Sequence, residues 1–155
     1  MRSVEQWLQE YGVSHQNPTN KLIHWICVPV IVLSVIGLLG SIPVPEFMHN
    51  ISPRLNFGSL ALLLAIIYYA FLSIPLAVGM TLFSILIVYI LHLMLGLDIA
   101  LWKQCLALFV IAWIVQFIGH EIEGKKPSFL KDIQFLMIGP LWLLSFIYKK
   151  LGIKY

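Results

Sequence analysis

Charged residues are scarce in this sequence. Only 11% of its 155 residues are Asp, Glu, Lys or Arg, whereas 60% are hydrophobic. So few charges leave too little polar surface to cover a soluble globule of this length, which excludes an ordinary water-soluble domain. The hydrophobic residues also fall in long blocks and do not alternate with polar ones as they would in a transmembrane barrel. The sequence therefore predicts an all-α membrane protein.

Cysteine is equally rare, with only Cys27 and Cys105. Both lie inside hydrophobic blocks, so we interpret them as small apolar fillers and not as a disulfide. The first residues, from Met1 to Tyr11, include acidic side chains and lack a continuous apolar core, which argues against a signal peptide. We therefore expect the first hydrophobic block to be retained in the membrane.

The chain also lacks a concentrated basic patch. Its net charge is +3 and its lysines are spread over several expected loops, so we expect contacts with membrane lipids and none with nucleic acid. No internal repeat and no long linker divides the sequence, and we expect residues 1–155 to form a single integral-membrane domain. The short loops favour a bacterial inner membrane, or the endoplasmic reticulum in a eukaryotic host.

Long uncharged stretches define the expected spans, because about 20 apolar residues cross a membrane as a helix. One stretch runs from Leu22 to Pro45, and another from Leu55 to Leu97 is long enough for two crossings. Ser73-Ile74-Pro75 divides the second stretch, since proline interrupts a helix and restricts the residue before it. The expected spans are 22–45, 57–73, 76–95 and 104–120.

Two further segments complete the expected bundle. The block 133–148 contains Gly139-Pro140 and is expected to cross, kink or lie at the interface, giving four to five transmembrane helices. At the N-terminus, Val4, Trp7, Leu8 and Tyr11 recur at helical spacing. They predict a short amphipathic helix that either lies on the membrane or packs against the bundle.

A first polar cluster lies at the start of the first span. Asn17 followed by Pro18 is typical of a helix start, because asparagine caps free backbone N–H groups and proline lacks the first of them. In a helix that begins there, Asn20 and His24 lie four residues apart on one face. His15 lies just before the helix, where it can fold back toward His24.

A second polar cluster ends the fourth span. Gln116, His120 and Glu123 are spaced by four and three residues, which places them on one polar stripe that should face the interior of the bundle. Gly119 allows close approach of a neighbouring backbone, and Gly124 is a helix-ending signal.

Topology brings the two clusters together if the second and third spans both cross completely. His15, His24 and His120 then share a membrane face and form a plausible metal site, whereas a polar packing network of neutral histidines would leave much the same pattern. The same count places His92 on the opposite face, and His49 lies in an expected proline-rich loop. The candidate supporting residues around the three histidines are Glu123, Asn17, Asn20 and Gln116.

These clusters resemble a known family, the small membrane-bound 2-hydroxy-fatty-acid dioxygenases, which include the fungal enzyme of phytosphingosine breakdown. The similarity is carried by the segment HQNPTNKLIHWICVP and by a later one ending at Pro127. Within them, the matching residues are His15, Asn17, Pro18, Asn20, His24, Pro29, Lys103, Gln104, Trp113, Gln116, Phe117, Gly119, His120, Glu123 and Pro127.

The resemblance implies an Fe(II)-dependent dioxygenase of fatty-acid α-oxidation, which uses O₂ to convert a 2-hydroxy fatty acid to one a carbon shorter. It implies His15, His24 and His120 as iron ligands and catalytic residues. Glu123 would be a fourth ligand or orient an imidazole, and Lys125 or Lys126 would attract the substrate carboxylate. The chief alternative is a non-enzymatic lipid-binding or assembly protein with structural histidines.

Overall fold

The structure is a computed structural model that describes residues 2–130 and 133–155. All regular elements in this described part of the chain are helical, which confirms the predicted all-α class. In chain order they are α1 (Val4–Val13), α2 (Pro18–Gly40), α3 (Glu46–Ile51), α4 (Phe57–Leu72), α5 (Ile74–Met94), α6 (Leu101–Glu123), the 3₁₀ turn η1 (Ser128–Leu130) and α7 (Phe135–Leu151).

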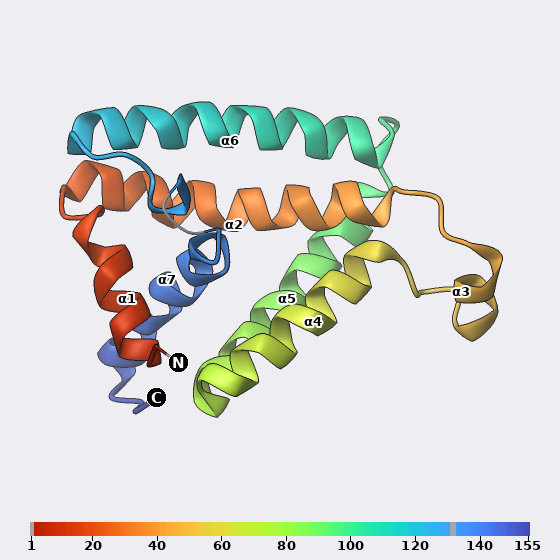
Figure 1. The fold of residues 1–155 in the computed structure, drawn as a ribbon. Coiled ribbons are helices and arrows are strands. Elements are labelled where there is room, and N and C mark those ends of the chain that lie inside the picture. The colour runs from red at the N-terminus through yellow and green to blue at the C-terminus, as the bar shows by residue number, and fades with distance from the viewer. Residues whose placement is uncertain (1, 131–132) are drawn as a thin grey trace.

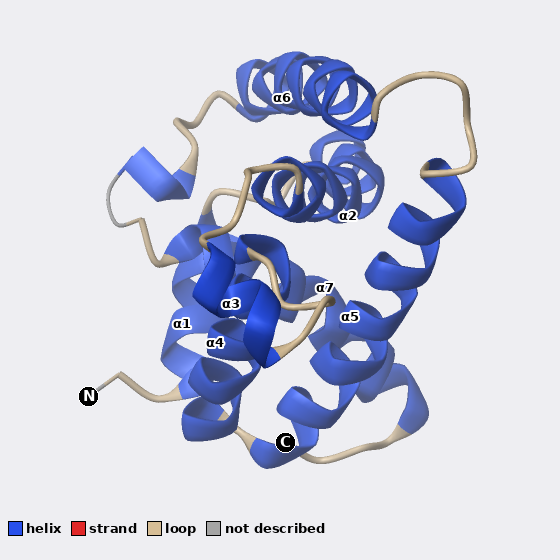
Figure 2. Cartoon of the chain, turned by 90° about the vertical axis from the view of Figure 1, so that its right-hand side faces the viewer, coloured by secondary structure: helices blue, strands red, loops and turns tan. Residues whose placement is uncertain are grey.

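Helices α2 and α6 lie side by side and antiparallel, and Figure 2 views them nearly along their axes. Small residues allow this close approach. The space in which Gly37 would carry a Cβ is filled by the Cys105 side chain, and a Cβ on Gly119 would lie 2.5 Å from Asn20 Oδ1. The antiparallel arrangement brings the beginning of α2 next to the end of α6, where both predicted polar clusters lie.

The ends of these two helices follow the predicted signals. Asn17 Oδ1 accepts a hydrogen bond from the Thr19 N–H at 2.8 Å, and Pro18 is the first residue of α2. Helix α6 ends at Gly124, which has a positive φ of 69° that glycine adopts without a Cβ clash. Both buried cysteines are free, as expected.

Helices α4 and α5 form the predicted hairpin. Ser73 both ends α4 and caps α5, because its side chain accepts a hydrogen bond from the Leu76 N–H, and Pro75 occupies the first turn of α5. The hairpin crosses α2 obliquely in Figure 1. Its first turn lies close to α2, since a Cβ on Gly58 would meet the Ile36 carbonyl oxygen at 2.5 Å.

Helix α1 packs against α7, so the packing alternative is the one observed for the N-terminal amphipathic helix. Trp7, Leu8 and Tyr11 are buried. The Trp7 ring meets Phe135 edge-on at a centroid distance of 5.2 Å, and Tyr11 lies 5.3 Å from Trp142. The face that would otherwise contact lipid is thus covered by protein.

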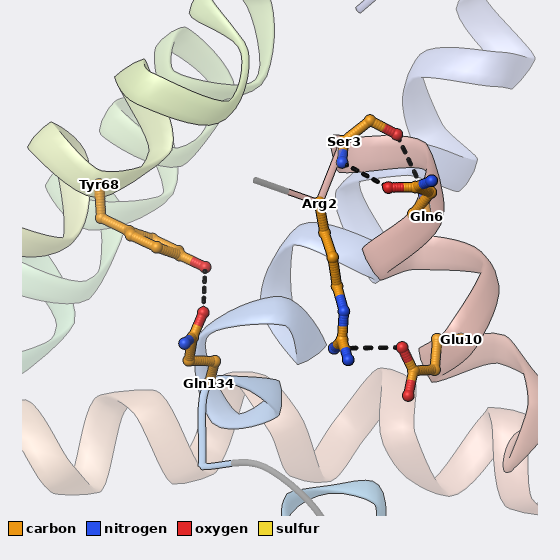
Figure 3. Close-up of polar contacts among 6 residues, drawn as sticks. All are labelled: Arg2, Ser3, Gln6, Glu10, Tyr68 and Gln134. Atoms are coloured by element: carbon orange, nitrogen blue, oxygen red, sulfur yellow. Dashed lines mark hydrogen bonds and ion pairs between the residues drawn. The ribbon is translucent and has the colours of Figure 1, made fainter.

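Figure 3 shows polar contacts of α1 and of the start of α7. Ser3 and Gln6 form a reciprocal capping box at the start of α1, and Arg2 pairs with Glu10 at 3.2 Å. The Tyr68 hydroxyl on α4 donates to Gln134 at the start of α7 at 3.5 Å. This hydrogen bond links α4 to the start of α7.

His49 and His92, the two histidines outside the predicted metal site, lie on α3 and α5. His49 is exposed on the short helix α3 and not in a loop, because Pro45 supplies a helix start that the sequence interpretation missed. His92 is exposed in the last turn of α5. Figure 1 places α3 and the C-terminal end of α5 away from the start of α2, and the membrane face of His92 stays a prediction.

Three described helices are long and apolar enough to cross a membrane, namely α2, α5 and α6, and α4 is a shorter apolar helix of 16 residues. Helix α7 is not among them, and its Tyr148 hydroxyl donates to the Pro75 carbonyl oxygen at 2.7 Å. A fifth crossing would put these two residues on opposite faces. The contact thus favours four crossings over five, and the span count itself stays a prediction.

Candidate metal centre

Three buried imidazoles meet where α1, α2 and α6 converge. His15 comes from the loop between α1 and α2, His24 from the second turn of α2 and His120 from the last turn of α6. Their exposed fractions are 1%, 0% and 5%. One ring nitrogen of each lies within 4.8 Å of the other two. The structure thus brings together the three histidines that the sequence grouped.

Backbone carbonyls fix the tautomers of two of these rings. His15 Nδ1 donates to the Tyr11 carbonyl oxygen at 2.6 Å, and His24 Nδ1 donates to the Asn20 carbonyl oxygen at 2.9 Å. A carbonyl oxygen can only accept, so each Nδ1 carries the proton and each neutral Nε2 presents a lone pair. The two Nε2 atoms face one another at 3.0 Å.

Two lone pairs at this distance repel unless a positive species lies near both. A shared proton would place a charge in a buried site, and burial, followed by the neighbouring His24, lowers the pKa of His15 to about 3. A metal ion satisfies both lone pairs without protonating either ring. Imidazoles held through Nδ1 by carbonyls are also the usual form of histidine metal ligands. The donor set therefore fits a metal ion.

His120 supplies a further unsatisfied group. Its Nδ1 is buried and has no hydrogen-bond partner among the described residues. Its ring centroid lies 5.1 Å from both His15 and His24. A polar packing network would be expected to pair this nitrogen, because an unpaired buried polar atom is costly. The geometry thus favours a metal site over the packing network left open by the sequence.

Glu123 holds the His15 loop against the end of α6. Its two carboxylate oxygens accept from the backbone N–H groups of Gln16 and Asn17, each at 2.8 Å, and from Asn20 Nδ2 at 3.2 Å. The carboxylate also complements the positive end of the α2 dipole. It is not one of the grouped ligand residues. Its contacts therefore suit an orienting function better than the alternative of a fourth ligand.

Asn20 connects all parts of this site. Its carbonyl orients His24, and its side-chain amide donates to the Ser14 carbonyl as well as to Glu123. The side chain is fully buried against Gly119, where any Cβ would displace it. Asn17, in contrast, caps α2 and lies at the edge of the site.

The two lysines proposed for carboxylate attraction lie outside the histidine cluster. Lys125 Nζ donates to the Val13 carbonyl oxygen at 2.7 Å, near the end of α1. Lys126 is exposed. Their suggested contact with a substrate stays a prediction, and the observed contact of Lys125 joins the α6 end to α1.

Aromatic residues that the sequence interpretation did not assign to the site enclose His15. The Tyr11 ring stacks on His15 at a centroid distance of 4.1 Å with 12° between the planes, and Trp142 lies 5.3 Å away. The spacing of Tyr11 and His15, four residues apart, was a usable signal for the first contact. Trp142 carried no such signal because α7 meets His15 only through the tertiary fold.

An apolar cavity of about 440 Å³ leads away from the histidines. His15 and His120 belong to its lining, and α2, α4, α5, α6 and α7 provide most of its walls. Near the histidines, three lining side chains have buried polar atoms that find no partner in residues 2–130 and 133–155. These atoms are Trp113 Nε1, Gln116 Oε1 and Ser128 Oγ.

Fold and site together define a helical protein with membrane-length apolar helices and a buried three-histidine centre that opens into an apolar cavity. The family described as 2-hydroxy-palmitic acid dioxygenase Mpo1-like matches residues 1–151, and the chain belongs to this family. The chain is 31% identical over 146 residues to the 2-hydroxy-palmitic acid dioxygenase MPO1 of Saccharomyces cerevisiae. The matched residues cover 92% of this chain and 78% of that protein. No solved structure matches the chain.

Proposed function

We propose that this protein is an Fe(II)-dependent dioxygenase that shortens 2-hydroxy fatty acids by one carbon. The observation that carries the proposal is the pair of facing Nε2 atoms of His15 and His24, with His120 beside them at the mouth of an apolar cavity. Family membership and the name of the yeast relative support the substrate class.

The proposed reaction balances with O₂ as the only oxidant. The bond between C1 and C2 of the substrate breaks, C1 leaves as CO₂, and C2 becomes the carboxyl carbon of the shorter fatty acid. The two carbons together lose four electrons, and O₂ accepts them. The carbon products together contain one oxygen atom more than the substrate. The second oxygen atom of O₂ is accounted for by one molecule of water.

In this proposal His15, His24 and His120 hold the iron, which supplies binding positions for O₂ and for the substrate oxygens when it is bound. The carbonyls of Tyr11 and Asn20 keep two of the imidazoles in the orientation that binding requires. The surrounding aromatic and aliphatic residues exclude water from the reacting carbon.

The polar end of the cavity matches the head of a 2-hydroxy acid. Gln116 Oε1 needs a donor, which the 2-hydroxyl group provides, whereas Trp113 Nε1 needs an acceptor, which the carboxylate provides. The Ser128 hydroxyl can serve either group. We assign these three side chains to positioning the head of the substrate, with its acyl chain directed into the cavity.

The decisive experiment loads the purified, untagged protein with Fe(II) without oxygen and then adds O₂ and 2-hydroxypalmitate. We expect stoichiometric iron and mass-spectrometric detection of pentadecanoate. His24→Ala and His120→Ala should each lose iron and turnover while still inserting into the membrane, because the apolar helices are unchanged.

His49→Ala is the matched control, since His49 is exposed on α3. It should keep both iron and turnover. A folded protein that binds no iron and leaves 2-hydroxypalmitate intact would instead support a non-enzymatic lipid-binding or assembly function.

A further inference from the structure

The cavity follows α2 and α6 for a defined distance. Its lining extends from Val28 to Leu39 on α2 and from His120 back to Phe109 on α6. At about 1.5 Å per residue, each of these stretches is about 16 Å long. One leaflet of a bilayer takes up about 15 Å, half of the hydrocarbon thickness of about 30 Å, so the cavity has the length of an acyl chain.

The neighbouring helix α4 provides two of the smallest side chains of the lining. Ala61 and Ala65 lie four residues apart, which places them on one face of α4, and both line the cavity. Larger residues occupy most of the opposing wall, including Ile36 and Phe83. The small side chains of Ala61 and Ala65 therefore leave space in the cavity that a larger residue would fill.

The packing clusters give the order of these positions along the cavity. Ala65 packs against the cluster that contains Val28, Tyr69 and Tyr11, and the Tyr11 ring stacks on His15. Ala61 packs against the second cluster, whose α2 members Leu33 and Ile36 lie farther from His24 along the helix than Val28 does. Ala61 is therefore the distal position, and the two alanines are separated by about 6 Å along the axis of α4.

We propose that Ala65 and Ala61 determine which acyl chain lengths the cavity accepts, with Ala61 setting the limit for long saturated chains. This inference rests on the proposed function for the identity of the head group. The cavity itself supports the rest: among the described residues, its lining has unpaired buried polar atoms only on α6 and on Ser128, Ala61 and Ala65 present apolar surface on α4, and its length matches one acyl chain.

The test compares Ala61→Phe and Ala65→Phe with Ala107→Phe, which places the same side chain on the exposed face of α6. Turnover and binding by native mass spectrometry are measured with 2-hydroxylaurate, 2-hydroxymyristate, 2-hydroxypalmitate and 2-hydroxystearate. Each methylene group excluded from the cavity should weaken binding about fourfold. Ala61→Phe should thus lower kcat/KM for 2-hydroxypalmitate, relative to kcat/KM for 2-hydroxylaurate, by about tenfold or more.

Ala65→Phe should move the preference to still shorter chains, and Ala107→Phe should leave it unchanged. Ala61→Leu and Ala65→Leu repeat the comparison with less added volume, and size-exclusion elution together with the thermal unfolding midpoint establishes that each variant is folded. The opposite change, Leu39→Ala, should favour 2-hydroxystearate.

The outcomes separate this inference from the proposed function. Turnover with the same chain-length preference in folded Ala61, Ala65 and Ala107 variants would overturn the inference and leave the dioxygenase intact. A wild type that converts none of the acids, but binds them with a preference that shifts in the two α4 variants, would overturn the dioxygenase and leave the acyl cavity.

Discussion

At the scale of single residues, the facing Nε2 atoms of His15 and His24 determine the chemistry of the centre. Each ring is held by a carbonyl four residues earlier in the chain. These two local hydrogen bonds leave the Nε2 lone pairs of both rings facing one another at 3.0 Å, which is an electrostatic conflict. The conflict disappears when a cation binds. A neutral His15 is a condition for this arrangement, and that condition makes the site sensitive to acid.

The first prediction concerns the pH dependence of the metal-free protein. The pKa of His15 is about 3 when folded, below its ordinary value of 6.5, because burial opposes its charged form. Between these values the unfolded chain binds a proton that the folded chain does not, so stability falls as pH falls. At about 1.4 kcal/mol per pH unit, acidification from about pH 6.5 to about pH 5 should cost about 2 kcal/mol.

This loss is measured as the free energy of unfolding in detergent after chelation of metal. His15→Gln removes one of the three buried imidazoles and should make the dependence shallower over this interval, by about the 2 kcal/mol assigned to His15. An equally steep decline in that variant would show that other groups cause it.

The second prediction separates orientation from ligation at Glu123. Glu123→Ala removes the acceptor of two backbone N–H groups and should lower the free energy of unfolding by about 2 kcal/mol, as expected for hydrogen bonds to a charged group. It should also weaken iron retention, because the loop that carries His15 is loosened. Saturating iron should nevertheless restore full occupancy, which His24→Ala cannot achieve. Failure to restore it would indicate direct ligation.

At the scale of helices, the close contact of α2 and α6 sets the separation of the three imidazoles. Gly119→Ala would place a Cβ 2.5 Å from Asn20 Oδ1, whose side chain is fixed by Ser14 and Glu123. We expect a loss of about 1–3 kcal/mol in stability, typical of an overpacked contact, and a parallel loss of iron.

Gly12→Ala is the control for this variant, because its Cβ would lie 3.5 Å from Trp142 Nε1, an ordinary contact distance. It should be neutral or stabilising, since alanine favours the helix over glycine. Equal thermal unfolding midpoints for the two variants would contradict the importance of the α2–α6 contact.

Several helix boundaries were predictable from sequence because a local capping signal marks them, although the start of α3 after Pro45 was missed. Asn17-Pro18 marked the start of α2, Ser73-Ile74-Pro75 the hairpin, and Gly124 the end of α6, because capping depends on neighbouring residues alone. The course of α7 was not predictable. Its Pro140 and C-terminal lysines left several placements open, and contacts with α1 and the α4–α5 hairpin decided among them.

The same distinction applies to the site. Helical spacing grouped Asn20 with His24 and Gln116 with His120, and the span count brought the two groups to one face. The sequence did not reveal that Glu123 bonds to backbone N–H groups more than a hundred residues away, or that Trp142 covers His15. Such contacts depend on how helices pack in three dimensions.

At the scale of the whole molecule, we propose that the chain forms one integral-membrane domain with four crossings. Single cysteines at Thr19, Phe47 and Lys154, introduced after Cys27→Ala and Cys105→Ala, report the face of each position by labelling with a membrane-impermeant maleimide. Thr19 and Lys154 should be labelled from the same side and Phe47 from the other. A fifth crossing predicts that Lys154 is labelled with Phe47.

The distribution of the centre along the chain has a consequence for biosynthesis. His15 and His24 leave the ribosome early, whereas His120 and its neighbour Glu123 follow only after α4 and α5 have been made. While α4 and α5 are being made, the nascent chain therefore presents two of the three imidazoles, and the triad exists only once α6 lies beside α2. Because α7 follows α6 in the chain and places Trp142 near His15, the centre is covered only after the three imidazoles have been brought together.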